Sequence, residues 1–436
     1  MLPVELTKNK ISEIRKKIEK KNSVFAEKRY LDSMVLPSKI IGREAQTEKL
    51  LSHIMSLEDG FVVPFVSVYG RSGSGKSTVV KFVCENLLDL ISFRFTNLRK
   101  ARTVFGCANL ILGNLDGESL SSAQGLNRAV DCIQSQIECI LKKDEKKYFV
   151  LVLDEYDVIF SDGRGNPSDF VYKLLQMEEN LRERGLWVCI ITISNNALYE
   201  YDLDDRVKSR MGSAEIHFTP YSESNILGIL YDRAKKAFKI KLHDGILNHC
   251  AKLASSDHGD ARRALDLLRV AGEICDGVIK KDDVEKAQKI IQKDRVDEIV
   301  ANASYHMRCV VGAIVSLAIV KEQSWSATSH IFKKYTEIVS KDNPLKYRRV
   351  SDLLVELENT GILVSRAYSR GRGGYGKEYK LKVDPGVVGP SVSEEFYDLQ
   401  IQRRAEVDKL KEYQKLLKSR GRHNFANMYS RLLKDF

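Results

Sequence analysis

Short, uninterrupted apolar runs recur along the first half of the chain and are separated by segments of helical periodicity. Runs of this length are typical of strands that are buried on both faces, as in a parallel sheet. The expected strands lie just before residue 70 and at 93–97, 148–153 and 186–193, with helices at 127–141 and 168–183. Because strands alternate with helices, the pattern predicts an α/β fold with a doubly wound parallel sheet.

The pattern changes after Pro220, and a length of 436 residues allows two to four domains. Helical spacing of apolar residues from 222 to 292 predicts an all-helical domain. Farther on, helices followed by two strands around a glycine-rich turn predict a winged helix-turn-helix. The expected domains are a basic helix at 1–22, an α/β domain at 23–221, a helical domain at 222–298, a winged-helix domain at 299–390 and a charged helical tail at 391–436.

The segment GRSGSGKST, between the first strand and its helix, fits the phosphate-loop pattern G-x-x-x-x-G-K-[ST] at every fixed position. Glycines let the backbone curl with its N–H groups inward, and the following helix adds the positive end of its dipole. Lys76 would contact phosphate oxygens and the Ser77 hydroxyl would hold Mg²⁺, whereas a chance Gly/Ser loop is the alternative. The nucleotide-binding candidates in this loop are Gly70, Arg71, Ser72, Gly73, Ser74, Gly75, Lys76, Ser77 and Thr78.

Two carboxylates, Asp154 and Glu155, stand at the carboxyl end of the strand predicted at 148–153. In a parallel sheet this end lies beside the phosphate loop. Asp154 would coordinate Mg²⁺, and Glu155 would polarise the attacking water, as phosphoryl transfer requires. The alternative is that the pair only caps the next helix.

Three further segments hold candidates for the same site. Asn195 follows an inner strand, where its amide can hold the attacking water, although a turn-forming Asn-Asn pair explains it equally. Arg262 begins a helix near the domain junction, where a ligand role competes with an ion pair to Asp266. In phosphate-loop enzymes the segment before the first strand commonly lies against the base of the nucleotide. The alternative is that this segment is only a helix cap. The base-pocket candidates are Ile41, Gly42 and Arg43, and Tyr221 is a further nucleotide-binding candidate.

The net charge of +11 suits a polyanionic partner without identifying one. Residues 301–390 carry 14 Lys or Arg against 8 Asp or Glu. Basic residues crowd the glycine-rich hairpin, where they could contact DNA phosphates and the minor groove. Two more basic residues begin the helix that would enter the major groove. A solvated basic loop is the alternative. The DNA-contact candidates here are Arg348, Arg349, Arg366, Arg370, Arg372, Gly373 and Lys377.

Eight scattered cysteines without a C-x-x-C pair predict reduced thiols in an intracellular protein, and no zinc site is expected. The longest apolar run, 309–320, is too short to span a bilayer, so no membrane partner is expected.

Taken together, the segments GRSGSGKST, VLVLDEYD, ITISNN, DDRVKSR, HGDARRALDLLR and PLKYRRVSDLLVELENTGIL with SRGRGGYGKEYKL resemble the replication-initiator family. This family comprises the archaeal origin-recognition proteins and their eukaryotic relatives in origin recognition and helicase loading. The likeness runs from about residue 23 to 385. It implies an AAA+ phosphate-loop ATPase domain, a helical lid and a winged helix, and the absence of a long basic amino-terminal extension favours the archaeal type.

The resemblance assigns roles to individual residues. Those that match the two nucleotide motifs and the two sensors are Lys76, Ser77, Asp154, Glu155, Asn195 and Arg262. Arg210 is similar to a finger that some members insert into a neighbour's ATP site, with Arg206 as a rival. The stretch 96–125 resembles the initiator-specific insertion, in which Arg99 and Arg102 are the candidate DNA contacts.

The implied cofactors are ATP and Mg²⁺, and the implied partners are double-stranded origin DNA, the minichromosome maintenance helicase and a second copy or paralogue at the ATP site. The expected location is the cytoplasm, on the nucleoid, or the nucleus if the source is eukaryotic. Two functions remain open: an ATP-switched initiator that recruits the helicase, and a DNA-binding regulator or transposition-type ATPase that loads nothing. The fold cannot separate these two functions, but the insertion favours the first.

Overall fold

The computed structural model describes residues 10–13, 15, 24–163, 165–212, 214–256, 259–322, 324–339, 343–369 and 375–419. The chain divides into two compact units, Met1–Val284 and Glu285–Phe436, and the helix α11 (Lys281–Asn302) crosses the division. Within the predicted basic helix at 1–22, residues 10–13 and 15 are helical and the rest lie outside the described residues. The end of the predicted tail, 420–436, also lies outside them.

A five-stranded parallel sheet forms the centre of the first unit, as the apolar runs predict. Its strands are β1 (Phe65–Gly70), β2 (Ile91–Asn97), β3 (Tyr148–Asp154), β4 (Trp187–Ser194) and β5 (Glu215–Phe218), in the order β2-β3-β4-β1-β5. Every neighbouring pair is parallel. The order places β1 in the interior of the sheet, so the loop that follows it opens between its neighbours' carboxyl ends.

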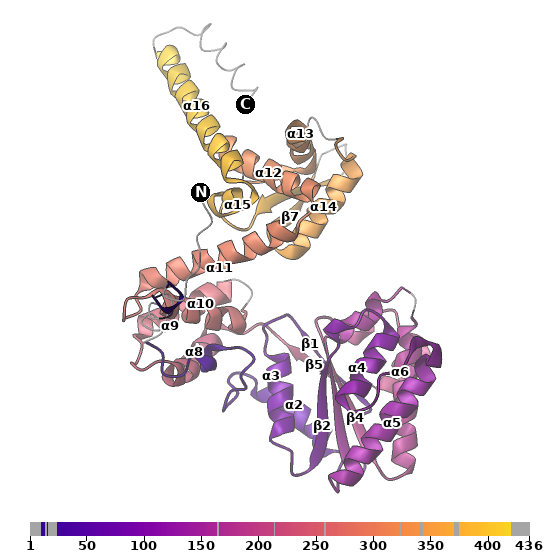
Figure 1. Cartoon of the computed structure of the whole chain (residues 1–436). Helices are drawn as coiled ribbons and strands as arrows, with labels where there is room; N and C mark the ends of the chain where they lie inside the picture. Colours follow the sequence, from indigo (N-terminus) through magenta and orange to yellow (C-terminus); the bar gives the residue numbers. More distant parts are fainter. Residues whose placement is uncertain are drawn as a thin grey trace. The chain divides into compact units, whose positions relative to one another are not determined.

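Helices cover both faces of this sheet (Figure 1). One face carries α2 (Glu44–Met55) and α3 (Lys76–Glu85), and the other carries α4 (Val104–Asn114), α5 (Gly125–Lys143) and α6 (Pro167–Glu183). Side chains of β3 alternate between the two layers: Leu151 and Leu153 pack with α4–α6, whereas Val150 and Val152 pack with α2 and α3. Because both faces are buried, the strand is apolar at every position from 149 to 153.

Three further helices complete the first unit: α8 (Glu223–Ala237), α9 (Asp244–Ser256) and α10 (Ala261–Ile274), called the lid helices below. They correspond to the helical domain predicted after Pro220. The helix α7 (Asp205–Met211) connects β4 to β5. Short 3₁₀ turns occupy Lys28–Leu31, Leu98–Lys100, Ser122–Gln124, Tyr156–Ser161 and Leu198–Glu200.

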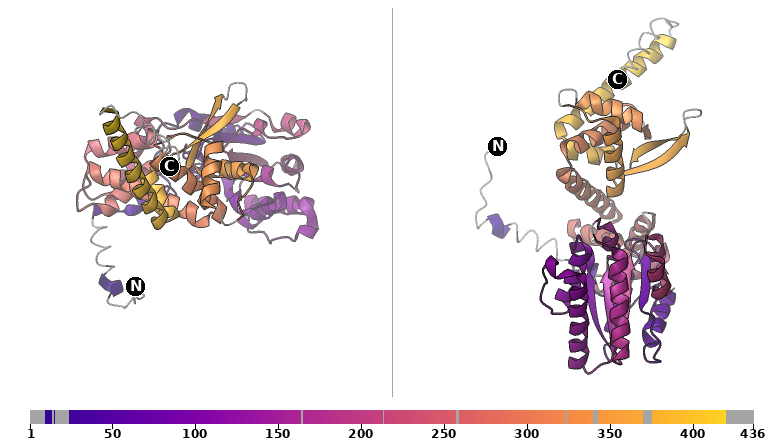
Figure 2. Two further views of the ribbon diagram at one scale, coloured as in Figure 1. Left: turned by 90° about the horizontal axis from the view of Figure 1, so that it is seen from above. Right: turned by 90° about the vertical axis from the view of Figure 1, so that its right-hand side faces the viewer.

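The second unit contains the expected winged helix. Its helices are α12 (Tyr305–Val320), α13 (Thr328–Ile338) and α14 (Tyr347–Thr360), and its strands are β6 (Ser326–Ala327), β7 (Leu363–Ser369) and β8 (Tyr375–Leu381). The strands form an antiparallel sheet in the order β6-β8-β7, and the β7–β8 hairpin stands out from the helices of this unit in Figure 2. Gly361 ends α14 in the left-handed conformation (φ 80°), which is the usual role of a glycine at this position.

From Cys309 to Val320 the helix α12 is apolar on all sides, because it is covered on two sides. The winged-helix core packs on one side, and α15 (Pro385–Val392) and α16 (Glu394–Ser419) pack on the other. A hydrogen bond lies inside this second contact: the Ser316 hydroxyl donates to Oε1 of Gln400 at 2.7 Å, and both residues are 1% exposed. The predicted tail therefore begins as a helix that completes the core of the second unit.

Six of the eight cysteines are buried, which agrees with thiols that behave as small apolar side chains; the exceptions are Cys132 and Cys139. In the part of the chain that the structure describes, no helix combines the length and the apolar character that crossing a membrane requires.

Ser316→Ala should destabilise the second unit by about 1–3 kcal/mol, because the buried Gln400 oxygen loses its donor. The double variant Ser316→Ala with Gln400→Leu should recover most of this loss, since neither buried polar group then remains. Urea unfolding can be followed through Trp325 in a Trp187→Phe background. A double variant that is as unstable as the single one would contradict the role of this hydrogen bond.

Candidate functional site

The phosphate loop connects β1 to α3 and depends on three glycines. Gly70, Gly73 and Gly75 have φ values of 147°, 77° and 90°. A Cβ atom on Gly70 would lie 2.2 Å from the Phe218 carbonyl oxygen, and one on Gly75 would lie 2.2 Å from the Tyr221 hydroxyl. Backbone conformation and lack of space therefore both require glycine at these two positions.

Lys76 lies at the start of α3 and is 8% exposed. Its Nζ donates to the carbonyl oxygens of Gly70 at 2.6 Å and Arg71 at 2.9 Å, so the side chain folds back over the loop. Burial lowers the pKa of Lys76, and the nearby Arg262 lowers it further, whereas Asp154 raises it. An anion in the loop would relieve this burial cost because it supplies the missing counter-charge.

Ser77 and Asp154 meet beside Lys76. The Ser77 hydroxyl donates to Oδ2 of Asp154 at 3.1 Å, and Asn97 Nδ2 lies 3.5 Å from the same oxygen. Burial raises the pKa of Asp154, an effect that the Ser77 hydrogen bond opposes. Mg²⁺ that is bound to phosphates keeps several waters and needs only one or two oxygen ligands from the protein. A hydroxyl and a carboxylate can supply them. The donor set therefore fits Mg²⁺.

Glu155 follows Asp154 in the left-handed conformation (φ 55°). One carboxylate oxygen lies 3.2 Å from Nη1 of Arg99, a residue that the sequence suggests as a DNA contact. Arg99 is 74% exposed, so water screens this pair and its contribution to stability is small. The structure thus brings a cation of the 96–125 stretch to the candidate general base.

Asn195 lies at the carboxyl end of β4, as expected, and its backbone N–H donates to Oδ2 of Asp157 at 2.9 Å. Asp157 also hydrogen-bonds to Tyr201, whose pKa is raised to about 12 mainly by burial. Asp157 was not singled out from the sequence, although its place in LDEYD, two residues after Glu155, was the available signal. It anchors the backbone of the Asn195 turn.

A pocket lies between the phosphate loop and the lid helices. Its lining includes six of the sequence candidates together with apolar residues of α8 and α10: Ile41, Gly73, Gly75, Thr78, Tyr221, Arg262, Ile229 and Leu265. Arg262 stands in the first turn of α10, where its N–H donates to Oδ1 of Asp260 at 2.8 Å. Asp266, the alternative partner, lies 3.2 Å from Arg269. The lid thus presents Arg262 to the pocket that contains the loop.

Arg43 is placed differently from the base-pocket expectation. Its guanidinium donates to the carbonyl oxygens of Ser74 (3.0 Å) and Thr219 (2.6 Å) and stacks on Tyr221, 3.8 Å from the ring centroid. Neither Gly42 nor Arg43 belongs to the described lining of the pocket. Arg43 therefore contacts the backbone of the phosphate loop from the protein side.

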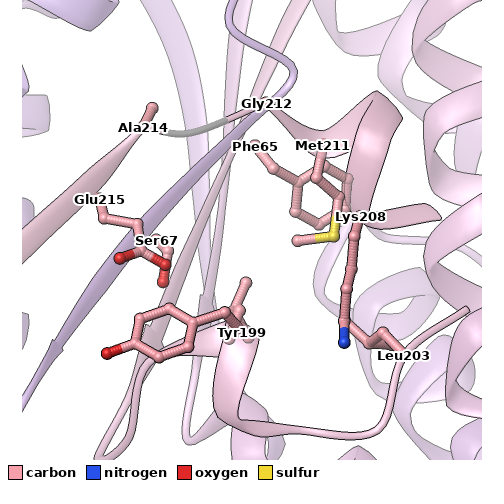
Figure 3. A pocket seen from close by; sticks show the side chains of 10 residues that line it. Phe65, Ser67, Tyr199, Leu203, Lys208, Met211, Gly212, Ala214 and Glu215 are labelled. Carbon is pink, nitrogen blue, oxygen red and sulfur yellow. The ribbon is translucent and has the colours of Figure 1, made fainter. Parts of the chain in front are cut away.

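The two finger candidates lie on the exposed side of α7. The Arg206 side chain is 89% exposed, and its Nε lies 3.7 Å from Oδ1 of Asp204. Nη1 of Arg210 lies 3.7 Å from Oε1 of Glu179, and the guanidinium lies over the ring of Tyr172. The opposite side of α7 borders a cavity of about 100 Å³, which Lys208 helps to line (Figure 3). Phe65 and Ser67, from the amino half of β1, also line this cavity, so it is separate from the phosphate loop.

The described DNA-contact candidates of the second unit lie on the β7–β8 hairpin and on α14. Arg366 pairs with Glu378 at 2.8 Å and stacks over Trp325, and Lys377 lies 3.7 Å from Glu358. Arg349, on α14, lies 3.1 Å from Glu356, whereas Arg348 is exposed and has no ion pair among the described residues. The exposed Arg102 belongs to the first unit, and Arg370, Arg372 and Gly373 lie outside the described residues.

Comparisons with known proteins agree with this arrangement. Family models match at residues 66–218 (ATPase family associated with various cellular activities), 227–289 (Cdc6 AAA+ ATPase-type lid domain) and 298–389 (CDC6, C terminal winged helix domain). The ORC1-type DNA replication protein 1 of Sulfurisphaera tokodaii is 32% identical over 389 residues, which cover 86% of this chain and 94% of that protein. The ORC1-type DNA replication protein of Thermococcus onnurineus is 32% identical, with coverages of 86% and 92%.

Among solved structures, the Aeropyrum pernix ORC1 protein in complex with DNA is similar with a TM-score of 0.70 and 28% identity. The similarity covers 87% of this chain and 99% of that one. It therefore extends over both compact units.

Lys76→Ala should weaken the binding of MgATP about ten- to a hundredfold, because the loop loses its charged hydrogen-bond donor to phosphate. Lys81→Ala is a matched control in the same helix, since Lys81 lies 3.9 Å from Glu85 and outside the loop. Isothermal titration calorimetry measures both affinities. Equal affinity of the parent and Lys76→Ala would contradict the assignment of the phosphate site.

Proposed function

Since the chain belongs to the family of ORC1-type DNA replication proteins, we propose that it is an ATP-switched initiator that binds origin DNA and recruits the replicative helicase. The observation that carries this proposal is that a phosphate loop with both acidic partners faces Arg262 of the lid, in a chain that also has a winged helix. The pairing supplies a nucleotide-sensing part and a DNA-binding part.

In ATP hydrolysis, a few residues would bind the phosphates, hold Mg²⁺ and accept the proton of the attacking water. Lys76 holds the phosphates, and Ser77 and Asp154 would hold Mg²⁺, which neutralises charge on the phosphate oxygens. Glu155 accepts a proton from the attacking water, and Arg262 contacts the phosphates from the lid. Glu155 must leave Arg99 or share its carboxylate with the water, since the two side chains lie 3.2 Å apart.

DNA binding is supported by the Aeropyrum pernix ORC1 protein, which has been solved in complex with DNA and is similar over most of both chains. In this chain Arg348, at the exposed start of α14, would enter the major groove, and the β7–β8 hairpin would follow the phosphates. Arg102 would add a contact from the first unit. Most of the affinity would come from phosphates, because a hairpin positions few side chains firmly enough to read bases.

The partners follow from the same proposal. Arg210 would reach the ATP site of a second copy or paralogue, and the minichromosome maintenance helicase would be the recruited protein at the nucleoid. A DNA-binding ATPase that loads nothing is the competing function. Copurification of the source organism's helicase with the ATP-bound protein, and its release from Lys76→Ala, supports the initiator. Retention of origin DNA without any helicase would favour the competitor.

Glu155→Gln should leave ATP affinity nearly unchanged and lower kcat about 10²- to 10⁴-fold, because the amide cannot accept the proton of the attacking water. Glu145→Gln is the matched control: Glu145 has almost the same left-handed backbone (φ 56°) and stands outside the site. Phosphate release under saturating ATP measures kcat. Undiminished turnover in Glu155→Gln would contradict the role of the glutamate as base.

Arg348→Ala should weaken binding to an origin duplex by about 1–3 kcal/mol if its guanidinium reads a base, or reduce the salt slope by about one if it binds a phosphate. Arg349→Ala should have the smaller effect, because that side chain already pairs with Glu356. Fluorescence anisotropy across a salt series, on origin and scrambled duplexes, separates the two results. Parent-like binding by Arg348→Ala under all conditions would exclude it from the DNA surface.

A further inference from the structure

Residues 24–41, called the strap below, precede α2 in sequence but pack on the lid helices. The backbone N–H groups of Ala26 and Glu27 donate to the carbonyl oxygen of Ala237 at 2.8 and 3.2 Å, and the Lys239 N–H donates to the Val24 carbonyl at 3.1 Å. These bonds join the start of the strap to the end of α8.

Side chains continue this attachment along the strap. The Phe25 ring lies 4.9 Å from that of Phe238, and a Cβ on Gly272 of α10 would approach Phe25 to 2.5 Å, so glycine makes room for the ring. Lys28 pairs with Glu273 at 2.8 Å. Arg233, which is 4% exposed, donates from Nη2 to the Val35 carbonyl oxygen at 2.6 Å.

The lid helices are therefore linked to the sheet by two crossings of the chain, at residues 41–43 and at residues 219–221. The first crossing is tight: Gly42 has a φ of 66°, and a Cβ there would lie 2.4 Å from the side chain of Asn225 on α8. Any displacement of the lid relative to the sheet has to be absorbed at these two short segments.

Arg43 contacts both crossings and the phosphate loop at once. It belongs to the first crossing, its Nη2 donates to the Thr219 carbonyl in the second, and its Nε donates to the Ser74 carbonyl of the loop. The guanidinium also lies over the rings of Tyr221 (3.8 Å) and Phe218 (5.4 Å) and is 3% exposed. Among the described residues it forms no ion pair with a carboxylate, so carbonyl groups and ring faces balance its charge.

We propose that Arg43 is a positioning residue that couples the conformation of the phosphate loop to the position of the lid, and that the strap moves with the lid as part of it. The proposal rests on the proposed ATPase function. When phosphates order the loop, the Ser74 carbonyl fixes Arg43, and Arg43 fixes Thr219 and Tyr221 at the root of α8. Arg262 on α10 is then held toward the phosphates.

Lysine cannot replace arginine in this role. Two carbonyl oxygens from separate segments are bound by two different nitrogens of one planar group, and the same plane stacks on Tyr221. An ammonium group is a single point of donation on a flexible stem and has no plane to stack. Arg43→Lys therefore keeps the charge and removes the geometry.

The decisive experiment measures lid position and catalysis in the full chain. Spin labels on Lys252→Cys (α9) and Lys142→Cys (α5), with Cys132 and Cys139 changed to Ser, report the distance between lid and sheet. In the parent, ATP should narrow the distance distribution. In Arg43→Lys, ATP affinity should fall about tenfold, as for one lost hydrogen bond to a charged group, and the distribution should remain as broad as without ATP.

Arg184→Lys is the matched control, because Arg184 is a surface arginine just after α6 that pairs with Glu138 of α5 at 2.6 Å. It should retain parent affinity and parent narrowing. If Arg43→Lys does not fold, the double variant Phe25→Ala with Lys28→Ala tests the same coupling by loosening the strap, and it should also lose the ATP-dependent narrowing.

Failure of the Arg43 coupling and failure of the proposed ATPase function would give different results. ATP-dependent narrowing in Arg43→Lys, or in the strap variant, equal to that in the parent overturns the coupling while the ATPase assignment stands. A parent that neither binds nor hydrolyses ATP overturns the proposed function instead.

Discussion

The parallel register of β1, β3 and β4 is the constraint on which the nucleotide site depends. Tyr69 pairs with Ser194, and Asp154 pairs with Ile193 on one side and Asn97 on the other. The phosphate loop, both acidic side chains and the Asn195 turn consequently begin at one edge of the sheet. A slip of one residue would move a partner by about 3.3 Å and turn its side chains to the opposite face, so the packing of the apolar strands sets the spacing of the polar site.

The site also concentrates buried charge without neutralising it by ion pairs inside the loop. Lys76 and Arg43 are almost fully buried and donate mainly to backbone carbonyl groups, while Asp154 accepts from a hydroxyl. Burial moves the pKa of Lys76 down and that of Asp154 up, so each charged form is less stable than it would be in water. Such groups gain most from a ligand that brings phosphate and a divalent cation together.

The positions of those residues of the candidate site that local pattern and sheet topology determine could be predicted from the sequence. The loop glycines, Lys76, Asp154 and Asn195 each follow from a short motif at the end of an apolar strand. The start of β2 was missed because Ser92 interrupts the apolar run; its hydroxyl is buried and donates to Asp144 at 2.6 Å. Arg43 could not be placed, because its partners Ser74 and Thr219 lie 31 and 176 residues away and bind it through their backbone. The pairing of Arg99 with Glu155 likewise depends on a chain segment 56 residues away.

Because α12 is buried on two sides, the winged helix of the second unit depends on the helices that follow it in sequence. A winged helix usually needs one apolar stripe on its first helix, and the other side is free to vary as surface. Here Val310–Val320 has no solvent side, because α15 and α16 cover what would otherwise be surface. A fragment cut at residue 389, where similarity to the winged-helix family model ends, would expose a hydrophobic stripe and tend to self-associate. Recombination could therefore exchange this DNA-binding module between proteins only together with α15 and α16.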